Sequence, residues 1–370
     1  MKSSCRSMRI AYLGQMADVA TENGISKKIR GQAIRWTEDG HAVRYFSLAP
    51  TTRVWPGLAP IEIELVARGN PLTRLRRSFV LAARIRTWQP DLIYFRYAYH
   101  SPGFPALFRR IPTVAEINSD DLAEYPVTLS AAKLVYHRLT RRRILDSVAG
   151  FAPVTRELLT RFASFGKPAV VIANGIALPE RPSAPPVAGN SPRLIFVGSP
   201  GSPWHGLERL AELARLLPEL HFDVVGCPAP LMPQPSNLQF HGAMSRDAYE
   251  PLLHQATAAV GTMALFRKHM QEACPLKVRE YLAAGLPVIA AYRDTDITDD
   301  ADYFLRLPND SSPLAPHRER IAKWLGQWRG RRVAQEAVAH LSIAHKEAQR
   351  LAFFKSIVEW VHLGNAIATT

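Results

Sequence analysis

The segment MQEACPLKVREYLAAGLPVIA, residues 270–290, places a loop, a helix and an apolar strand in direct succession. Pro275 stands where helices often begin, and Gly285 is the residue type that most often follows a helix C-terminus. The apolar run 286–292 has the length and composition of a buried strand. The segment therefore predicts part of an open α/β sheet, with the helix N-terminus pointing toward a ligand cleft.

The same alternation of short apolar runs and longer segments of helical period extends over most of the chain, and it occurs twice. In the first half the expected strands are 9–14, 41–49, 61–67, 91–97, 112–118, 150–155 and 169–174. In the second half they are 193–198, 221–226, 237–242, 258–264 and 286–292. A helix over 25–38 completes a βαβ opening, and helices are expected over 313–328 and from 333 to about 360. The pattern predicts an α/β fold of two Rossmann-like domains.

A proline-rich stretch without apolar periodicity, 181–192, separates the two halves and is expected to be a linker. It divides the chain into an N-terminal Rossmann-like domain, 1–180, a C-terminal Rossmann-like domain, 193–330, and a helical segment, 331–370, that can return to the first domain. Open α/β sheets bind ligands at the carboxyl ends of their strands. Two such domains facing an interdomain cleft suit an enzyme with two substrates.

The positive charge is concentrated in the first half. The chain has 46 Lys and Arg against 32 Asp and Glu, a net charge of +14, of which residues 1–175 contribute +13 and residues 176–370 only +1. Such a half favours an acidic partner, such as anionic lipid, nucleic acid or phosphate. The N-terminal clusters show no zinc spacing, RNP signature or helix-turn-helix pattern, so nucleic-acid binding is the weaker of these interpretations.

Apolar residues alternate with arginines in RLRRSFVLAARIR, residues 74–86, where Leu75, Phe79, Val80 and Ile85 accompany the charges. This pattern is typical of an amphipathic segment on an anionic bilayer, and the interpretation is peripheral attachment to a membrane near a lipid-linked acceptor. A solvated helix face without a partner is the alternative. Further arginines that add to the basic character stand at 109, 110, 138 and 141–143.

Cysteine usage and hydropathy indicate the compartment. Cys5, Cys227 and Cys274 have neither disulfide nor zinc spacing, which favours a reducing, cytoplasmic setting. The longest apolar stretches are shorter than the roughly 18 to 20 residues that span a bilayer, and the first ten residues lack the apolar core of a secretory signal. We therefore expect a cytoplasmic protein that can sit at the inner face of the cytoplasmic membrane.

Two glutamates frame the loop and helix of residues 270–290. Glu272 precedes the helix and Glu280 falls in its first turns, whereas Lys277 and Arg279 add positive charge beside the helix N-terminus. A helix N-terminus and cations suit a diphosphate, and carboxylates can bind sugar hydroxyls. Each glutamate also has an ordinary interpretation, Glu280 as a favourable charge at a helix N-terminus and Glu272 as a solvated loop residue.

The E-x7-E pattern followed by YLAAGLPVIA resembles the signature of family-4-type retaining glycosyltransferases of the GT-B fold. The likeness covers most of the chain through an ordered set of segments. These are NGISKKIRGQAIRWTEDGHAV from 23, PDLIYFRY from 90, VIANGI from 171, LIFVGS from 194 with WHG at 204–206, and NLQFHG from 237.

The resemblance implies transfer of a hexose from a nucleotide-diphosphate sugar to an acceptor hydroxyl with retention of anomeric configuration. It also implies a glycan or lipid-linked acceptor, a bacterial cell-surface polysaccharide or glycolipid pathway, and neither cofactor nor metal. A nucleotide-sugar epimerase on the same scaffold is the rival function. The D-x-D sequence Asp294-Thr295-Asp296 has the form of a metal site, but such short Asp runs are ordinary turn residues.

Carried onto this sequence, the resemblance implies that Glu272 contacts the hydroxyls of the transferred sugar and that Glu280 binds the ribose. Lys277 would lie near the diphosphate, and backbone amides of the turn around Cys274 and Leu276 would lie against the sugar. In the first domain, Gly24 would allow backbone to approach the sugar, and Asn118 stands where such enzymes often place a histidine. A turn glycine and a strand-end turn residue are the alternatives for those two positions.

The chain departs from the family pattern around the expected diphosphate. Ser199 and His205 occupy places where an arginine and a lysine are common, and Ser199 brings no charge. A histidine with its ordinary pKa is only partly cationic at pH 7, and His205 can also be a core or surface residue. The diphosphate contacts are therefore expected to fall to four cations, namely Arg267, Lys268, Lys277 and Arg279.

Overall fold

The computed structural model describes residues 7–15, 19–67, 69–179 and 192–368, without the side chains of 71–72 and 364–368. They form two compact units, which we call the N-terminal unit (Met1–Ala173 with Ile343–Thr370) and the C-terminal unit (Asn174–Ser342). The second unit thus begins at 174, whereas the sequence placed the boundary at 180. The expected linker lies, except for Pro192, outside the described residues, as does Cys5.

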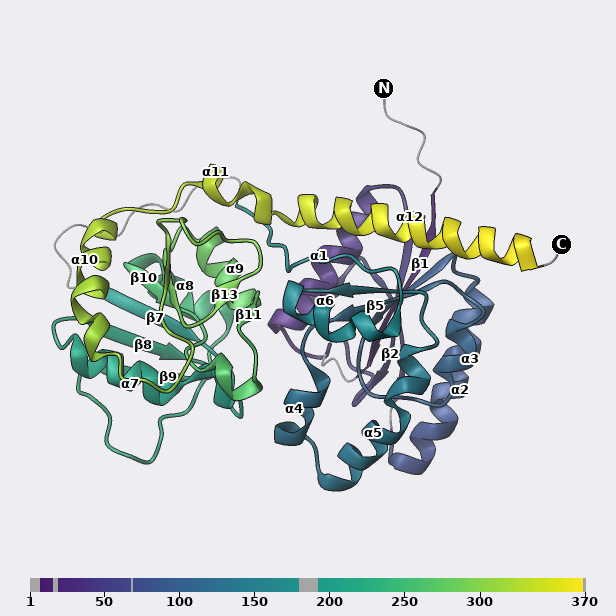
Figure 1. Ribbon diagram of the computed structural model, residues 1–370, viewed down its shortest axis with the longest axis horizontal. Helices are drawn as coiled ribbons and strands as arrows, with labels where there is room; N and C mark the ends of the chain where they lie inside the picture. The colour runs from purple at the N-terminus through teal and green to yellow at the C-terminus, as the bar shows by residue number, and fades with distance from the viewer. Residues whose placement is uncertain (1–6, 16–18, 68, 180–191, 369–370) are drawn as a thin grey trace. The chain divides into compact units, whose positions relative to one another are not determined.

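A six-stranded parallel sheet of order β3-β2-β1-β4-β5-β6 forms the centre of the N-terminal unit. Its strands are β1 (Arg9–Gln15), β2 (Ala42–Ala49), β3 (Glu62–Ala67), β4 (Leu92–Arg96), β5 (Thr113–Ile117) and β6 (Gly150–Pro153). The connecting helices are α1 (Gly24–Glu38), η1 (Pro56–Leu58), α2 (Pro71–Trp88), α3 (Phe104–Phe108), α4 (Asp121–Thr128), α5 (Ala131–Leu145), α6 (Arg156–Phe162) and η2 (Ala163–Phe165). Right-handed crossovers put α1 on one face and α2 and α3 on the other (Figure 1).

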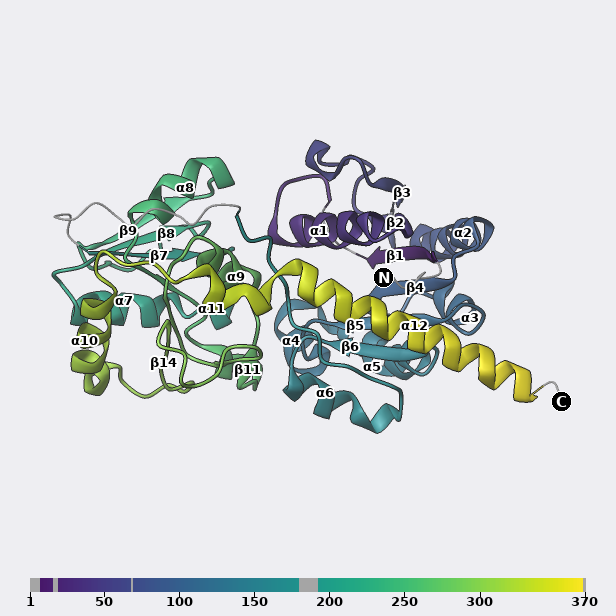
Figure 2. The same ribbon diagram turned by 90° about the horizontal axis from the view of Figure 1, so that it is seen from above.

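The last helix of the chain, α12 (Ile343–Ala368), packs beside α1 as part of the N-terminal unit (Figure 2). Phe354 of α12 is fully buried, with its ring centroid 5.5 Å from Trp36 of α1 and 5.2 Å from Tyr94 of β4. Tyr12 of β1 completes this aromatic cluster, 5.5 Å from Trp36. The apolar face of the C-terminal helix is therefore part of the core that holds the first sheet.

The C-terminal unit has a second six-stranded parallel sheet, of order β14-β12-β10-β7-β8-β9. Its strands are β7 (Arg193–Val197), β8 (His221–Val225), β9 (Leu238–Gly242), β10 (Ala258–Val260), β12 (Val288–Ala290) and β14 (Phe304–Arg306), and β11 (Glu272–Ala273) pairs with β13 (Arg293–Asp294) beside it. The helices are η3 (Pro203–His205), α7 (Leu207–Leu216), α8 (Arg246–Gln255), η4 (Leu265–Lys268), α9 (Leu276–Ala283), η5 (Ala315–His317), α10 (Arg318–Trp328), α11 (Gln335–Val338) and η6 (Ala339–Leu341). The α/β fold of two parallel-sheet domains is thus confirmed.

Several expected elements differ in detail. Residues 169–174 form a single bridge, Ala169 to Phe151, and otherwise run irregularly beside β6. The helix expected from 313 begins at Arg318 after a 3-10 turn. The helix expected from 333 is interrupted at Ser342, whose extended backbone, with ψ at 145°, separates the η6 turn from α12. Within the described residues, no helix combines the length and the apolar character needed to cross a membrane.

Each sheet has one point where the chain reverses its direction of progress across the strands. In the N-terminal unit β1 lies between β2 and β4, and in the C-terminal unit β7 lies between β8 and β10. At such a point the loops after the two adjacent strands separate and leave a crevice at the carboxyl ends, where open α/β sheets bind their ligands. The loops after β1 and β4, and after β7 and β10, are therefore the places to examine for a site.

Candidate active site

In the C-terminal unit, backbone hydrogen bonds join the loops after β7 and β10. Met263 N donates to His205 O at 3.1 Å, and Ala264 N donates to Trp204 O at 3.1 Å. Gly206 begins α7 with a φ of +70°, a left-handed conformation that glycine adopts without strain. A hollow of about 300 Å³ lies here, and its lining includes Ser199, Pro203, His205, Glu208, Cys227 and Arg267.

The loop after β8 closes one side of this hollow, because two backbones approach closely there. A Cβ on Gly226 would lie 2.1 Å from Gly198 O, and Gly226 has a φ of +82°, so only glycine fits. Gly198 N donates to Val225 O at 2.9 Å and Gly226 N to Gly242 O at 2.6 Å. These contacts bring Cys227 beside the loop that carries Ser199.

Lys277 places a cation near His205 and Cys227, two residues that line this hollow. Its Nζ lies 4.0 Å from the centroid of the Phe196 ring, is shielded from solvent and has no hydrogen-bond partner in the described part of the chain. Burial lowers the pKa of Lys277 to about 7, against a small opposing effect of Cys227. A desolvated ammonium of this kind is costly unless an anion accompanies it.

His205 is a neutral member of the site. Burial, together with repulsion from Lys277 and Lys268, lowers the pKa of His205 to about 3. Its ring packs edge-on against Phe196 with centroids 5.4 Å apart. The expectation that His205 is partly cationic at pH 7 is therefore wrong, because a buried imidazole beside two lysines does not take up a proton.

The segment that carries the E-x7-E pattern is held by specific contacts. Glu272 is 5% exposed, and its backbone in β11 lies opposite that of Arg293 in the parallel β11–β13 pair. Glu280 is half-buried on α9 and accepts a hydrogen bond from Tyr249 Oη at 3.3 Å. Cys274 is buried, and its carbonyl oxygen accepts a hydrogen bond from Asn174 Nδ2 at 2.7 Å.

The start of α9 is aimed by its attachment to the sheet. Pro275 is the N-cap residue, one place earlier than the N1 position expected, and Leu276 opens the helix. Val197 N, at the end of β7, donates to Tyr281 Oη at 2.6 Å, so α9 is tied to the strand whose loop carries Ser199. The N-terminus of α9 and the loop after β7 are thereby held to one another.

Arg279 does not belong to the charges available for a ligand. Its guanidinium is fully buried and makes two hydrogen bonds of 2.8 Å with the carboxylate of Asp294, while its Nε donates to Asn174 O at 3.0 Å. Burial opposes the charge of Arg279, but the ion pair outweighs it and raises the guanidinium pKa. The expected contact with diphosphate is wrong for Arg279, because this helix position points inward toward the loop of Asp294.

The same ion pair explains the D-x-D sequence. Asp294 is occupied by Arg279, and Asp296 lies 3.7 Å from the same guanidinium. No group of three His, Cys, Asp or Glu side chains that could hold a metal ion occurs in the described residues. The Asp run therefore stabilises the fold around α9.

Two further cations of the expected diphosphate set already have partners. Arg267 lines the hollow but pairs with Glu208 at 2.8 Å and donates to Pro203 O at 2.8 Å. Lys268 is buried with its Nζ 4.4 Å from the Trp204 ring centroid. Both side chains hold the loops after β7 and β10 together, and only Lys277 of the four has a buried ammonium without a hydrogen-bond partner.

Asn309, which the sequence did not single out, fixes the loop before Glu272. Its Oδ1 accepts from Phe266 N at 2.8 Å, and its Nδ2 donates to Met270 O at 2.7 Å and Gln271 Oε1 at 3.0 Å. It lies just after β14, the edge strand of the sheet. Its sequence signal was only a polar residue after a short apolar run.

The predicted site residues of the N-terminal unit lie at the carboxyl ends of its strands. Gly24 is the exposed first residue of α1, after the N-cap Asn23, whose side chain accepts from Ile25 N and Ser26 N. Asn118 follows β5, and its amide contacts both a lysine and a glutamate. Its Oδ1 accepts from Lys28 Nζ at 3.1 Å and its Nδ2 donates to Glu116 Oε2 at 2.9 Å.

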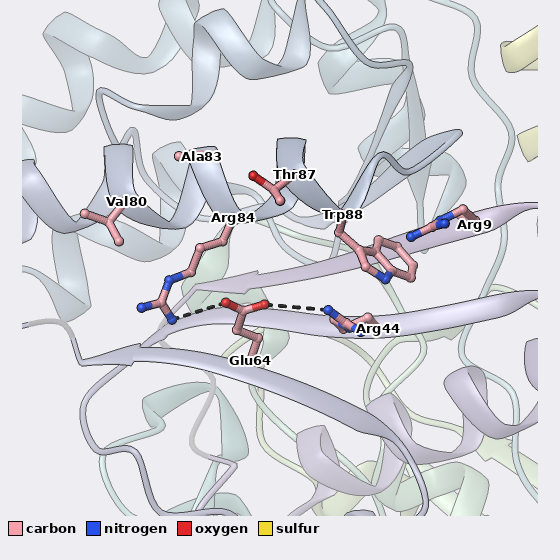
Figure 3. A pocket seen from close by; sticks show the side chains of 8 residues that line it. All are labelled: Arg9, Arg44, Glu64, Val80, Ala83, Arg84, Thr87 and Trp88. Atoms are coloured by element: carbon pink, nitrogen blue, oxygen red, sulfur yellow. Dashed lines mark hydrogen bonds and ion pairs between the residues drawn. The ribbon is translucent and has the colours of Figure 1, made fainter.

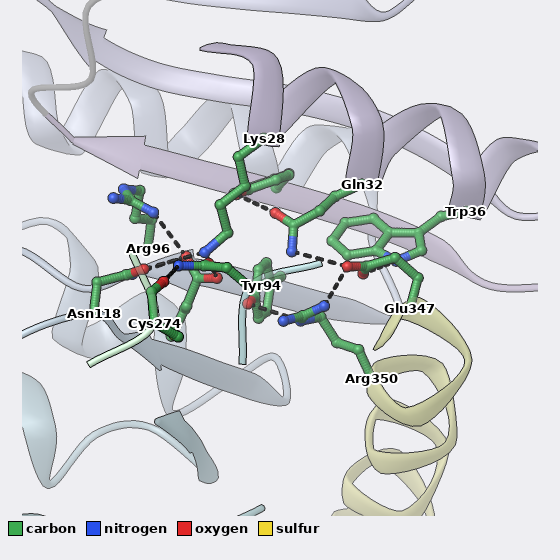
Figure 4. A network of polar contacts seen from close by, with 12 residues as sticks. Lys28, Gln32, Trp36, Tyr94, Arg96, Asn118, Cys274, Glu347 and Arg350 are labelled. Atoms are coloured by element: carbon green, nitrogen blue, oxygen red, sulfur yellow. Dashed lines mark hydrogen bonds and ion pairs between the residues drawn. The ribbon is translucent and has the colours of Figure 1, made fainter. Parts of the chain in front are cut away.

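Around Asn118 lies a buried charge network that the sequence did not reveal. The carboxylate of Glu116 is completely buried and pairs with Lys28 Nζ at 2.6 Å and Arg96 at 3.0 Å (Figure 4). Burial would raise the pKa of Glu116, but the two cations outweigh it and hold that pKa well below its usual range. Burial lowers the pKa of Lys28 to about 8, although Glu116 favours its charged form.

The network continues to the C-terminal helix. Trp36 Nε1 donates to Glu347 Oε2 at 2.8 Å, and Arg350, which pairs with Glu347, donates through Nε to Tyr94 Oη at 2.9 Å. Gln32 accepts from Tyr12 Oη at 2.8 Å and donates to Glu347 at 3.3 Å. These contacts connect α1, β1, β4 and α12 within the unit.

A second hollow, of about 470 Å³, lies at the amino-terminal halves of β1 and β2 (Figure 3). Arg9 and Arg44 stack on Trp88 at 4.9 and 5.3 Å, and Glu64 pairs with Arg44 at 3.9 Å and with Arg84 at 3.1 Å. Most of its charge is thus internally paired, and it lies away from the carboxyl ends of the strands. We assign it no substrate role.

Two protein-family models match the chain, one in each half. The model of a glycosyl transferase 4-like domain matches residues 23–175, and the model described as glycosyl transferases group 1 matches residues 191–322. Together they cover more than three quarters of the chain. The chain is a GT-B glycosyltransferase. A comparison with curated protein sequences gave no match.

Solved structures of low sequence identity share the fold of this glycosyltransferase. The lipopolysaccharide outer core galactosyltransferase WaaB is 11% identical, with a TM-score of 0.63 over 94% of this chain and 100% of its own. HepE of Anabaena, in complex with UDP and glucose, is 18% identical, with a TM-score of 0.64 over 94% and 100%. The pneumococcal O-GlcNAc transferase GtfA, in complex with UDP and GlcNAc, is 10% identical, with a TM-score of 0.57 over 98% and 100%.

Proposed function

We propose that this glycosyltransferase moves a hexose from a nucleotide-diphosphate sugar to an acceptor hydroxyl with retention of anomeric configuration, in bacterial cell-surface polysaccharide or glycolipid synthesis. The observation that carries the proposal is Lys277, a desolvated ammonium without an anionic partner in the described residues, beside a hollow at the β7–β10 reversal point. A diphosphate supplies the missing anion. UDP in the complexes of HepE and GtfA favours a uridine nucleotide.

The residues around Lys277 take complementary parts in donor binding. Glu280, half-buried with one hydrogen bond from Tyr249, would bind the ribose hydroxyls. Glu272, at the loop before α9, would bind hydroxyls of the transferred sugar, with backbone amides near Cys274 and Leu276 against it. Ser199 and neutral His205 would offer hydrogen bonds to the diphosphate, and Arg267 and Lys268 would hold the surrounding loops. The sugar-facing roles of Gly24 and Asn118 stay predictions.

The reaction requires stabilisation of opposite charges on the two sides of the breaking bond. Cleavage between the anomeric carbon and the phosphate oxygen leaves positive charge on the sugar and negative charge on the diphosphate. Lys277 and the N–H groups that open α9 would stabilise the diphosphate. The acceptor hydroxyl then forms its bond to the anomeric carbon on the face that the diphosphate leaves, and its proton passes to a phosphate oxygen.

A screen of nucleotide sugars tests this function. Incubation with each donor and a set of acceptors should give a product whose anomeric configuration, measured by proton NMR, equals that of the donor. Inverted configuration in the product would refute retention. A changed sugar that forms without any acceptor would instead favour the epimerase.

The pKa of Lys277 predicts the pH dependence of donor binding. The ammonium form attracts the diphosphate, and its pKa of about 7 means that the free protein loses this charge as the pH rises. Binding above pH 7 must therefore take up a proton, so affinity for nucleoside diphosphate should fall with pH, by at most about tenfold per unit.

Two variants isolate this effect in calorimetric titrations from pH 6 to 9. Lys277→Arg keeps its charge throughout and should bind with little dependence on pH between 7 and 9. Lys277→Met should weaken binding roughly tenfold to a hundredfold at pH 6. If the affinity of the wild type and that of Lys277→Arg declined equally with pH, Lys277 would not be the group whose deprotonation weakens binding.

We also place the basic N-terminal unit at an anionic membrane surface, which fits a lipid-linked acceptor and a cytoplasmic protein at the inner face of the membrane. On α2, Leu75, Phe79 and Val80 are 48%, 52% and 45% exposed. Ile85 is fully buried, so the expectation that it joins this face is wrong. Exposed apolar side chains favour lipid over nucleic acid as the anionic partner.

The helix α5 extends this surface. Val135 and Leu139 are 56% and 75% exposed and share the helix with exposed Arg138, Arg142 and Arg143. Arg141 differs from its neighbours, because it pairs with the buried Asp121 at 2.6 Å. The basic cluster at 141–143 thus contributes two exposed arginines to the surface and one to the fold.

Flotation with liposomes tests the membrane surface. The double variant Phe79→Ser/Leu139→Ser should lose most of its binding to vesicles that contain anionic lipid, because two exposed apolar anchors are removed. Leu231→Ser, at a fully exposed position of the C-terminal unit, is the matched control and should bind like the wild type. Equal, negligible flotation of the wild type with neutral and anionic vesicles would contradict the assignment.

A further inference from the structure

The N-terminal unit has a polar cluster at its own reversal point, between the ends of β1 and β4. Gln15 is the last residue of β1, and Tyr99 and Ser101 lie in the loop after β4. Arg74 of α2 reaches into this cluster: its guanidinium lies 4.1 Å from the Tyr99 ring centroid and hydrogen-bonds the Tyr99 hydroxyl. The Nη2 of Arg74 is 3.4 Å from both Gln15 Oε1 and Ser101 Oγ.

Arg74 differs from several other arginines of this unit in having only neutral partners. Arg96, Arg141 and Arg161 each pair with a carboxylate. Arg74 makes no ion pair with an Asp or Glu anywhere in the described chain, and its hydrogen bonds all go to neutral oxygens. Among the described residues, therefore, no carboxylate compensates the positive charge of Arg74.

A second arginine, Arg143, adds positive charge near this cluster. His100 lies in the same loop, 7% exposed, and its Nδ1 is 2.8 Å from Tyr136 Oη of α5. Burial lowers the pKa of His100, and Arg143 and Arg74 lower it further. Tyr136 is also near the same two arginines, which partly offset the effect of burial on its pKa. Arg74 and Arg143 thus act on both His100 and Tyr136, and no acidic group in the described part of the chain offsets them.

Gln15 supplies an independent sign of a missing ligand. Its side chain is 5% exposed, and its Oε1 accepts from Ser101 Oγ at 3.1 Å. Its Nε2 is buried without a hydrogen-bond partner in the described chain. An unsatisfied buried amide N–H costs about 1 to 3 kcal/mol, so native structures rarely keep one that nothing binds.

We propose that Arg74, with the amide of Gln15 and the Ser101 hydroxyl, binds an anionic group of the acceptor, a phosphate or a carboxylate. The inference rests on the proposed transferase function and narrows it: the acceptor carries negative charge close to the hydroxyl that is glycosylated. The ligand satisfies both deficits of the cluster, because it neutralises the guanidinium and accepts the N–H of Gln15. The position at the β1–β4 reversal point is where this sheet type takes its ligand.

Titration calorimetry of the full chain with pyrophosphate and with glucuronate tests the inference. Either anion, if it binds the cluster, should lose at least about tenfold in affinity in Arg74→Gln, which keeps hydrogen-bonding capacity without charge. Arg74→Lys should retain part of the binding. Binding of pyrophosphate that depends on Arg74 would indicate a phosphorylated lipid acceptor. Binding of glucuronate that depends on Arg74 would indicate an acidic glycan. Arg84→Gln, on the same helix but paired with Glu64, is the control.

A second variant separates ligand binding from a structural role. Gln15→Glu introduces the carboxylate that Arg74 lacks, and it should raise the melting temperature while it abolishes anion binding to the cluster. Two results together would overturn the inference and leave the donor site intact. Pyrophosphate binding would be lost in Lys277→Met but unchanged in Arg74→Gln and Gln15→Glu. Glucuronate binding would be unchanged in these last two variants as well. Pyrophosphate binding that is unaffected by Lys277→Met would instead count against the donor site.

Discussion

Glu272→Ala is expected to lower the rate of sugar transfer by at least about a hundredfold, with the fold preserved. The carboxylate is 5% exposed in a loop that Asn309 and the β11–β13 pair hold in place. Hydrogen bonds from sugar hydroxyls to such a preorganised carboxylate act most strongly as positive charge develops on the sugar. Their loss therefore lowers kcat more than it raises KM for the donor.

The assay of Glu272→Ala requires two comparisons. Glu280→Ala should weaken nucleotide binding, because it removes the ribose contact, and its effect should appear largely in KM. Glu250→Ala, on α8 with 45% of its side chain exposed, should behave like the wild type. Circular dichroism and melting temperature report the fold. Near-normal turnover of Glu272→Ala would show that this carboxylate does not contact the reacting sugar.

The second large effect concerns stability. Asp294→Ala should lower the free energy of unfolding by about 3 to 5 kcal/mol, because it leaves the Arg279 guanidinium buried without its counter-ion. Both side chains of this pair have no exposed surface. The pair also fixes Arg279 on α9, so its loss should loosen the helix that carries Lys277 and Glu280.

Urea unfolding of matched variants measures this effect. Asp299→Ala breaks a surface pair, with 62% of the Asp299 side chain exposed, and should cost less than about 1 kcal/mol. The activity of the wild type should survive EDTA, since Asp294 is engaged by Arg279. An Asp294→Ala variant as stable as the wild type would contradict this structural role. If that variant were also inactive and the wild type lost its activity in EDTA, Asp294 would belong to a metal site and not to the fold.

The fold followed from the sequence because its signals are local and repeated. Apolar strands such as 9–14 and 221–226 alternate with amphipathic helices, and short connections between them allow few arrangements. The places where the sequence failed depend on tertiary contacts. Ser342 interrupts a helical pattern, and 169–174 runs beside β6 with only one bridge, which periodicity does not reveal.

The sequence predicted a candidate site in the segment 270–290, but it did not indicate which cations of that segment are paired inside the fold. The spacing of Glu272 and Glu280 indicated a site at the loop and α9 only because it resembles a family signature. Whether a cation on α9 is free depends on which way its side chain points: Lys277 lies by the hollow, whereas Arg279, two residues later, points to Asp294. The network of Lys28, Arg96 and Glu116 joins residues far apart in the sequence, and no motif marks such a set.

Crystallography of the chain with a nucleoside diphosphate tests the central claim most directly. We predict that the diphosphate lies in the hollow beside Ser199 and His205 within hydrogen-bond distance of Lys277 Nζ, with the ribose hydroxyls on Glu280. A nucleotide bound elsewhere, with Lys277 still unpaired and Glu280 without a ribose contact, would contradict the account.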